Sequence, residues 1–467
     1  MGRNYDGLVN ILSNFHPEFD SDELTKENIY KKLYPGKKFK ESVINTVLSG
    51  LNQLCEEFFI NQDFRNDQQR DMRLLRQYCK RGYKPKADKI LSRLEKFIER
   101  PAVNGLDYFK RMEMLDAMDI YYTSHDNRSM RNQHLIKSLL NLDYYFIIQS
   151  LIFKKELYSG KLYTENKPDD TLPLKIYNEI NFEKLIELIE KEDPENSLLL
   201  SIYFLIVKTY SDKFDDINYN KLRELIIENL KVFDFDTCKY LLLNLQLINT
   251  MRLNEGRKEY EKEWYEISKI LIEGKFYDRD ENWFRASHFR SIVKTGISMG
   301  DIEYIEQFIK NYARRLEPNL RTPLKHFAHA NVFFAKKMYN EALYNILRAE
   351  LNNTLYKIDS RRLTAKIYYE TNSIENLQSY LDAFSHFLKN IRTIDETIVN
   401  RNKRFIKYLK KLIRIKETSR DQYELNLLEN SMVNENVSEK NWLMKKISEM
   451  NIDNDKKSVN NLRTISN

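Results

Sequence analysis

The sequence predicts an all-α protein, organised as a right-handed α-solenoid of antiparallel helix pairs that begins with an N-terminal helical hairpin. Glycine and proline are scarce, with 11 Gly and 9 Pro in 467 residues, although average usage is about 7% and 5%. Apolar residues recur at the helical spacing of i, i+3 and i+4 along most of the chain. In the second half, this pattern repeats at roughly the 30–40-residue period of helical repeat proteins. The scarcity of turn residues disfavours folds with many tight turns, and the repetition favours stacked helix pairs.

Composition and charge limit the classes of function. The chain is 42% hydrophobic and 31% charged, with a formal net charge of +7, which is a small excess for a dedicated nucleic-acid binder. The three cysteines, Cys55, Cys79 and Cys238, lie far apart, so we expect neither a disulfide framework nor a zinc site. We find no apolar signal sequence and no apolar run as long as a membrane helix. We therefore expect a cytoplasmic protein without a cofactor.

The first 65 residues predict a helical hairpin. Thr25 is placed to cap a helix that ends at Tyr34-Pro35-Gly36, because Pro disfavours a helical residue before it and Gly permits unusual backbone angles. A second helix follows with one apolar stripe, formed by Val43, Val47, Leu51, Leu54 and Phe58. Lysines near the turn would also suit a DNA-binding helix-turn-helix, but the nearly all-apolar stripe favours a packed hairpin.

A helical tract and a polar loop follow the hairpin. Helical spacing continues to about residue 158, and the polar segment 160–173 contains Lys167-Pro168-Asp169-Asp170, which marks a candidate module boundary. We expect four parts in the chain. They are an N-terminal helical block over 1–65, a helical tract over 66–165, a helix-pair solenoid over 174–430, and a C-terminal helix with a polar tail over 431–467.

The clearest repeat spans residues 326–350. A tetratricopeptide repeat needs small residues where its two helices cross closely and large apolar residues in the groove between them. Six positions fit that pattern: Ala330, Phe333, Tyr339, Ala342, Ile346 and Ala349. A similar unit runs from Ala365 to Phe384, and an earlier one runs from Ile302 to Tyr312. The spacing therefore predicts tetratricopeptide-like helix pairs, with the repeat boundaries before residue 290 left open.

Segments near both ends of the chain carry a resemblance to a known family. They are Phe15-His16-Pro17-Glu18-Phe19-Asp20, the stretch from Leu24 to Lys37, Leu48-Ser49-Gly50-Leu51, and Lys440-Asn441-Trp442-Leu443-Met444-Lys445-Lys446-Ile447. In these segments the chain resembles an uncharacterised all-helical, tetratricopeptide-like repeat family of Bacteroidetes-like bacteria. The resemblance implies a match over the full length. It implies no activity, cofactor or functional residue.

The strongest charge feature is the stretch 401–416, which holds eight basic residues and no acid. On a helix, five of the basic residues share one face: Lys403, Lys407, Lys410, Lys411 and Arg414. Phe405, Leu409 and Leu412 form a second, apolar face. Three interpretations stay open for the basic face: a solvated outer surface, a surface for an acidic protein or nucleic acid, and a helix lying on a membrane.

Other candidate sites lack residues that their chemistry needs. His326 and His329 share a helix face, but a zinc site needs further ligands that the sequence does not indicate. Ser124, His125 and Asp126 are adjacent, so they cannot converge as a catalytic triad, and a loop between helices is expected there. No Gly-rich phosphate loop is found. The sequence thus indicates no catalytic residue and no metal ligand.

These patterns predict a non-enzymatic scaffold or adaptor that binds a protein or peptide on a concave helix surface. Two alternatives stay open. One is a nucleic-acid or membrane-surface adaptor that uses the basic helix 401–416, and the other is an enzyme whose site the sequence does not reveal.

Overall fold

The computed structural model describes an all-helical chain. It describes residues 4–16, 19, 21–65, 68–161, 171–212, 214–277, 283–392, 394–418 and 422–451. Within these ranges no β-strand occurs, which confirms the all-α prediction, and no helix is long and apolar enough to cross a membrane. The polar segment Lys167-Pro168-Asp169-Asp170 and the predicted polar tail after residue 451 lie outside the described residues.

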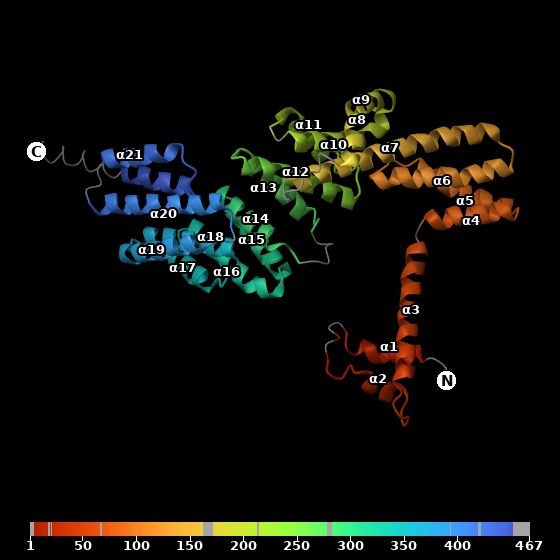
Figure 1. Cartoon of the computed structure of the whole chain (residues 1–467), viewed down its shortest axis with the longest axis horizontal. Helices are drawn as coiled ribbons and strands as arrows, with labels where there is room; N and C mark the ends of the chain where they lie inside the picture. The colour runs from red at the N-terminus through yellow and green to blue at the C-terminus, as the bar shows by residue number, and fades with distance from the viewer. Residues whose placement is uncertain are drawn as a thin grey trace, which may run out of the picture. The chain divides into compact units, whose positions relative to one another are not determined.

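The chain divides into two compact units, Met1–Tyr240 and Leu241–Asn467. Figure 1 labels the helices of both units. The first unit opens with α1 (Tyr5–Ser13), α2 (Lys26–Leu33) and α3 (Glu41–Arg65). Thr25 caps α2, since its hydroxyl accepts a hydrogen bond from the Asn28 amide at 3.2 Å. Gly36 turns the chain after α2 with a φ of 75°, an angle that favours glycine because it has no Cβ.

Helix α3 is buried along only half of its apolar stripe. Val47 is 3% exposed and belongs to the small core shared by α1, α2 and α3, whereas Leu54 and Phe58 are 44% and 60% exposed. The predicted stripe therefore packs against α1 and α2 in its first half and is exposed in its second half.

Two further helix pairs follow α3 in the first unit. They are α4 (Gln68–Lys80) with α5 (Lys84–Ile98), and α6 (Gly105–Ser124) with α7 (Arg128–Lys161). Met72, Leu94 and Met114 belong to one buried cluster that joins α4, α5 and α6. Helices α6 and α7 lie side by side (Figure 1). The face of α7 that carries Leu135, Leu139, Leu142, Phe146 and Phe153 is 43% to 59% exposed at these residues.

The first unit continues through five more helices. They are α8 (Leu172–Glu179), α9 (Phe182–Glu192), α10 (Pro194–Ser211), α11 (Asp216–Glu228) and α12 (Phe235–Asn254), the last of which contains the boundary between the units. Helix α10 contacts α7, α9 and α11. Most of its residues from Leu199 to Tyr210 are buried, among them Leu200, Tyr203 and Leu205, as expected of a helix that packs inside a core.

The second unit is a series of helix pairs. Its elements are α13 (Tyr260–Glu273), α14 (Ala286–Ser298), α15 (Ile302–Tyr312), the 3-10 turn η2 (Ala313–Arg315), α16 (Pro318–Ala335), α17 (Tyr339–Arg348), α18 (Thr354–Glu370), α19 (Ile374–Asn390), α20 (Glu396–Glu417), α21 (Gln422–Val433) and a helix over 440–451. Helix α14 packs on α15, α16 on α17, α18 on α19, and α20 on α21. Short connections make each pair antiparallel. Helix α16 also contacts both α14 and α18.

The six predicted repeat positions all fall in the α16–α17 pair or at its end. Four are buried, namely Ala330, Ala342, Ile346 and Ala349, and two are half-buried, namely Phe333 and Tyr339. Tyr339 begins α17 and Ala349 caps it. Ala330 and Ala342 are completely buried, which fits small residues at a close contact between helices.

The helix over 440–451 packs on α18 and α20. Leu443 and Ile447 are buried in the same cluster as Phe405 of α20. The Trp442 ring lies 5.3 Å from the ring of Tyr369, and its indole N–H donates to the Glu370 carboxylate at 2.9 Å. The segment after α21 therefore returns to the first helices of the two preceding pairs.

Candidate functional site

Seven charged side chains from distant parts of the second unit meet in one network, which we call the Asp359 cluster. Its members are Arg290 and Lys294 of α14, Asp359, Arg362 and Lys366 of α18, Arg401 of α20, and Glu439 before the last helix. Because charged residues are rarely buried unless they are paired, such a network requires each member to have partners.

Asp359 is the centre of the cluster, with a side chain that is only 4% exposed. Its carboxylate accepts hydrogen bonds from Arg290 and Arg362 and from the Lys294 ammonium group, the last at 3.2 Å. Burial alone would raise the pKa of this carboxyl, but the charges of Lys294, Arg362 and Arg290 outweigh that effect and hold the pKa well below its usual range. Asp359 is therefore ionised at neutral pH.

Glu439 supplies the second carboxylate. It lies 2.8 Å from the Lys366 ammonium group and 3.6 Å from the Arg362 guanidinium group. Burial opposes ionisation of Glu439, but Lys366, Arg362 and Lys294 lower its pKa to about 2. Its backbone has a φ of 57°, which is uncommon for a residue with a side chain and costs energy that the surrounding contacts must offset.

The cluster contains more positive than negative charge. Five cationic side chains face two carboxylates, so three positive charges remain in excess. The Arg401 Nε is buried and has no hydrogen-bond partner among the described residues. Burial and the nearby Arg362 lower the Arg401 pKa. Burial, together with Arg362 and Arg290, also lowers the Lys294 pKa, to about 8 against the pull of Asp359.

This arrangement is suited to binding an anion. Lys294 and Arg290 have side chains that are 31% and 25% exposed, so a ligand can reach the excess cations from solvent. An added carboxylate would neutralise part of the excess charge and accept charge-assisted hydrogen bonds, which are stronger than neutral ones.

Sequence reasoning did not identify the Asp359 cluster. The only local signal is a pair of cations four residues apart in each of two helices, Arg290 with Lys294 and Arg362 with Lys366. Such pairs share a helix face, but they are common on solvated faces, and Arg290 lies 69 residues from Asp359. Only the tertiary structure brings the residues of the Asp359 cluster together.

The predicted basic face of α20 lies on the surface of the helix. Lys403, Lys407, Lys410, Lys411 and Arg414 are all exposed. Phe405, Leu409 and Leu412 of the same helix are completely buried. Lys410 pairs with Asp382 of α19, which is 72% exposed. Arg401, the first basic residue of this stretch, faces the Asp359 cluster instead.

The remaining sequence candidates have local structural partners. His326 Nδ1 lies 2.9 Å from the Asn345 side-chain oxygen. Ser124 donates its hydroxyl to the Tyr121 carbonyl at 2.7 Å, and Asp126 is exposed next to Arg128. No group of three or more His, Cys, Asp or Glu residues in the described ranges is arranged to hold a metal ion.

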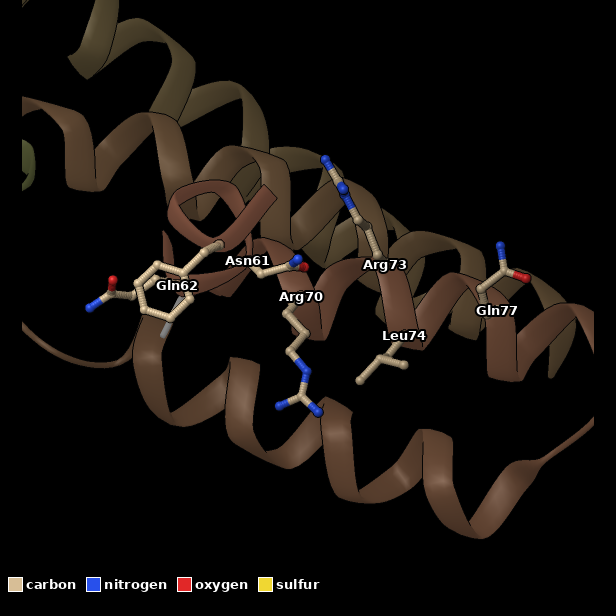
Figure 2. A pocket seen from close by; sticks show the side chains of 7 residues that line it. Asn61, Gln62, Arg70, Arg73, Leu74 and Gln77 are labelled. Atoms are coloured by element: carbon tan, nitrogen blue, oxygen red, sulfur yellow. The ribbon is translucent and has the colours of Figure 1, made fainter. Parts of the chain in front are cut away.

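An open pocket lies in the first unit, between the end of α3 and one face of α4. Its lining residues are Phe58, Asn61, Gln62, Arg70, Arg73, Leu74 and Gln77. Figure 2 shows the α4 side chains in a line along one helix, next to Asn61 and Gln62 of α3. None of the described lining residues is an acid, a histidine or a cysteine.

Comparison with known proteins gives no relative from which to carry over a function. No family model, no curated protein and no solved structure matches the chain.

Proposed function

We propose that this protein is a non-enzymatic scaffold that binds an acidic segment of a partner protein at the Asp359 cluster. In this proposal the helix pairs of the second unit form a right-handed, tetratricopeptide-like solenoid, and α14, α16 and α18 line its concave side. The observation that carries the proposal is the excess of three positive charges where α14, α18 and α20 meet.

An acidic protein segment fits this excess better than an apolar one. Aspartate and glutamate side chains extend from a backbone and can reach partly buried cations such as Lys294 and Arg290. Each new charge-assisted hydrogen bond contributes about 1.5–3 kcal/mol, which corresponds to roughly tenfold or more in affinity. Two or three acidic side chains in one segment would thus suffice for specific binding.

The test uses a fluorescently labelled peptide of alternating glutamate and glycine residues, with fluorescence polarisation as the readout. Wild-type protein should bind it, and Lys294→Gln and Arg401→Gln should each weaken binding by about tenfold. Neither change removes the only partner of Asp359 or Glu439, because Arg290, Arg362 and Lys366 remain. Lys403→Gln, on the exposed face of α20, is the matched control and should bind like the wild type.

The pH dependence of binding provides a second test at this site. Because the Lys294 pKa is lowered to about 8, the cluster loses one positive charge as the pH rises through that value. The affinity for the acidic peptide should fall between pH 7 and pH 9 in the wild type, and Lys294→Gln should remove this change. No binding of the peptide, or equal binding by all variants, would contradict the proposed function.

A second candidate function follows from the exposed basic face of α20. Five cations there are exposed while the opposite face is buried, so the helix can present positive charge to nucleic acid or to an anionic membrane. A salt series separates this adaptor from the scaffold. Binding to a nucleic-acid backbone weakens steeply with salt, whereas binding at the partly buried cations of the Asp359 cluster is screened less.

A further inference from the structure

We propose that the groove between α15 and α16 binds the phosphate group of a small organic phosphate. This groove uses none of the residues of the Asp359 cluster, so the inference is independent of the proposed function. Its volume is about 500 Å³, which leaves room for a phosphate and for the organic group attached to it.

Both helices contribute cationic side chains to the groove. Arg321 and Lys325 lie four residues apart along α16, so they share one helix face. Lys310 of α15 and Arg314 of η2 line the opposite side. Cations therefore face the same space from two directions, as the separate oxygen atoms of a phosphate require.

The groove has little negative charge to offset these cations. Glu306 is the one acid among its lining residues, and its carboxylate pairs with Lys336, outside the lining set, at 2.6 Å. Lys310 and Lys325 are exposed and form no hydrogen bond or ion pair with any described residue. Both ammonium groups are thus available to a ligand.

Arg321 is held in position before any ligand binds. Its Nε donates to the Leu316 carbonyl at 2.8 Å, and its guanidinium carbon lies 5.1 Å from the centre of the Trp283 ring. These contacts leave the two terminal nitrogens for a ligand. A guanidinium group with a fixed plane matches two phosphate oxygens at once, and fixing it in advance lowers the entropy lost on binding.

Two neutral donors add to the groove. His329 stacks on Phe333, and its pKa is lowered by burial and by the positive charges of Lys325 and His326. A neutral imidazole still offers one N–H donor. The exposed Thr322 hydroxyl also lines the groove. Together with the cations, these groups match an acceptor-only ligand with several oxygens.

The groove continues past Arg314. A neighbouring hollow of about 420 Å³ shares Gln307 and Arg314 with it, and its charged lining residues are Lys275, Arg314, Arg315 and one acid, Glu273. A ligand with two phosphate groups could therefore contact both hollows. We expect pyrophosphate to bind more tightly than inorganic phosphate for this reason.

The experiment is isothermal titration calorimetry of the full-length chain with inorganic phosphate, pyrophosphate and adenosine triphosphate as probes. The structure predicts binding of pyrophosphate or the triphosphate, and a loss of at least about tenfold in affinity in the double variant Lys310→Met, Lys325→Met. Both lysines are exposed, so this variant should fold, which circular dichroism verifies. Lys403→Met with Lys407→Met on α20 is the control, with the same loss of charge and unchanged binding.

Three results would overturn the inference. One is no heat of binding with any probe at concentrations of about 1 mM. Another is equal weakening in the double variant and the control, since this would mean that only the overall charge matters. The third is binding of a single-stranded RNA oligonucleotide, sensitive to Lys310 and Lys325, with none of the three small phosphates, because the groove would then serve a polymer.

Discussion

The ammonium group of Lys294 lies 3.2 Å from the carboxylate of Asp359, although the two residues belong to α14 and α18. Three other α-helices, α15, α16 and α17, separate them along the chain, together with the 3-10 turn η2. The Lys294–Asp359 ion pair therefore joins the first helices of two helix pairs, α14–α15 and α18–α19, which are not consecutive in sequence. Because Arg290 of α14 reaches the same carboxylate, Asp359 is a cross-link within the second unit as well as the centre of its charge cluster.

The first prediction concerns removal of this carboxylate. Asp359→Asn leaves Arg290, Lys294 and Arg362 facing one another without the negative charge that they share, and loss of one partner from a buried ion pair costs about 3–5 kcal/mol. Urea unfolding should report a loss of this size. Asp382→Asn is the control, because Asp382 is 72% exposed in its pair with Lys410 and should change stability by less than about 0.5 kcal/mol. Equal effects of the two changes would show that Asp359 is not a buried partner.

The second prediction concerns acid. The pKa of Glu439 is about 2 in the folded chain, below the usual value of about 4.3. A carboxyl group with a lowered pKa stabilises the fold at any pH above its unfolded pKa, and this contribution disappears as the pH falls through the folded pKa. Glu439→Gln should therefore destabilise the chain at pH 7. The difference in unfolding free energy between variant and wild type should shrink between about pH 4 and pH 2.

Urea unfolding at a series of pH values measures this difference directly. Glu435→Gln is a suitable control, since Glu435 lies on the same connection and 3.5 Å from Arg404. A difference for Glu439→Gln that stays constant with pH would mean that Glu439 does not ionise inside the cluster.

The helix pairs could be predicted from the sequence because their causes are local. Thr25, Pro35 and Gly36 mark the ends of α2 through capping and backbone preference, and Ala330 and Ala342 mark a close helix contact through their size. The Asp359 cluster has no such local cause. A charged residue in a helix is expected to face solvent, and only the tertiary structure, in which side chains of α14 reach α18, brings these charges together.

The sequence also does not predict which apolar helix faces are exposed. The stripe on α3 is periodic from Val43 to Phe58, but periodicity shows only that a face is apolar and does not show what covers it. Leu54 and Phe58 are exposed because the small core of α1 and α2 ends before them. The apolar face of α7 is exposed in the same way.

The third prediction tests the packing of the best repeat. Ala342 is completely buried in α17, which packs on α16. Ala342→Leu should overpack this contact and destabilise the chain by about 1–3 kcal/mol. Thermal melting is a sufficient measurement, with Glu341→Leu at the preceding, exposed position as the control for added apolar volume. An unchanged melting temperature in Ala342→Leu would mean that α16 and α17 do not approach closely there.

The fourth prediction separates the two candidate binding surfaces. Lys407, Lys410 and Lys411 are exposed, whereas Phe405 and Leu409 of the same helix are completely buried. Reversing the three lysines to Glu should therefore leave the fold intact, with each change within about 0.5 kcal/mol. If the Asp359 cluster is the binding site, the triple variant should also bind the acidic peptide with nearly wild-type affinity. The triple variant loses the surface pair of Lys410 with Asp382 and the contact of Lys407 with the Tyr408 ring, and exposed contacts of these kinds contribute little.

A thermal melt and a peptide titration on the same triple variant give distinct results for each alternative. Loss of peptide binding with a normal melt would place the binding surface on α20 and contradict the proposal for the Asp359 cluster. A lowered melting temperature would mean that the lysine stems pack against neighbouring helices, since long charged side chains can bury their methylene groups while the charge stays in water. Normal melting and normal binding together would leave the basic face of α20 as a solvated surface, and would leave Lys294 and Arg401 as the cations that the acidic partner contacts.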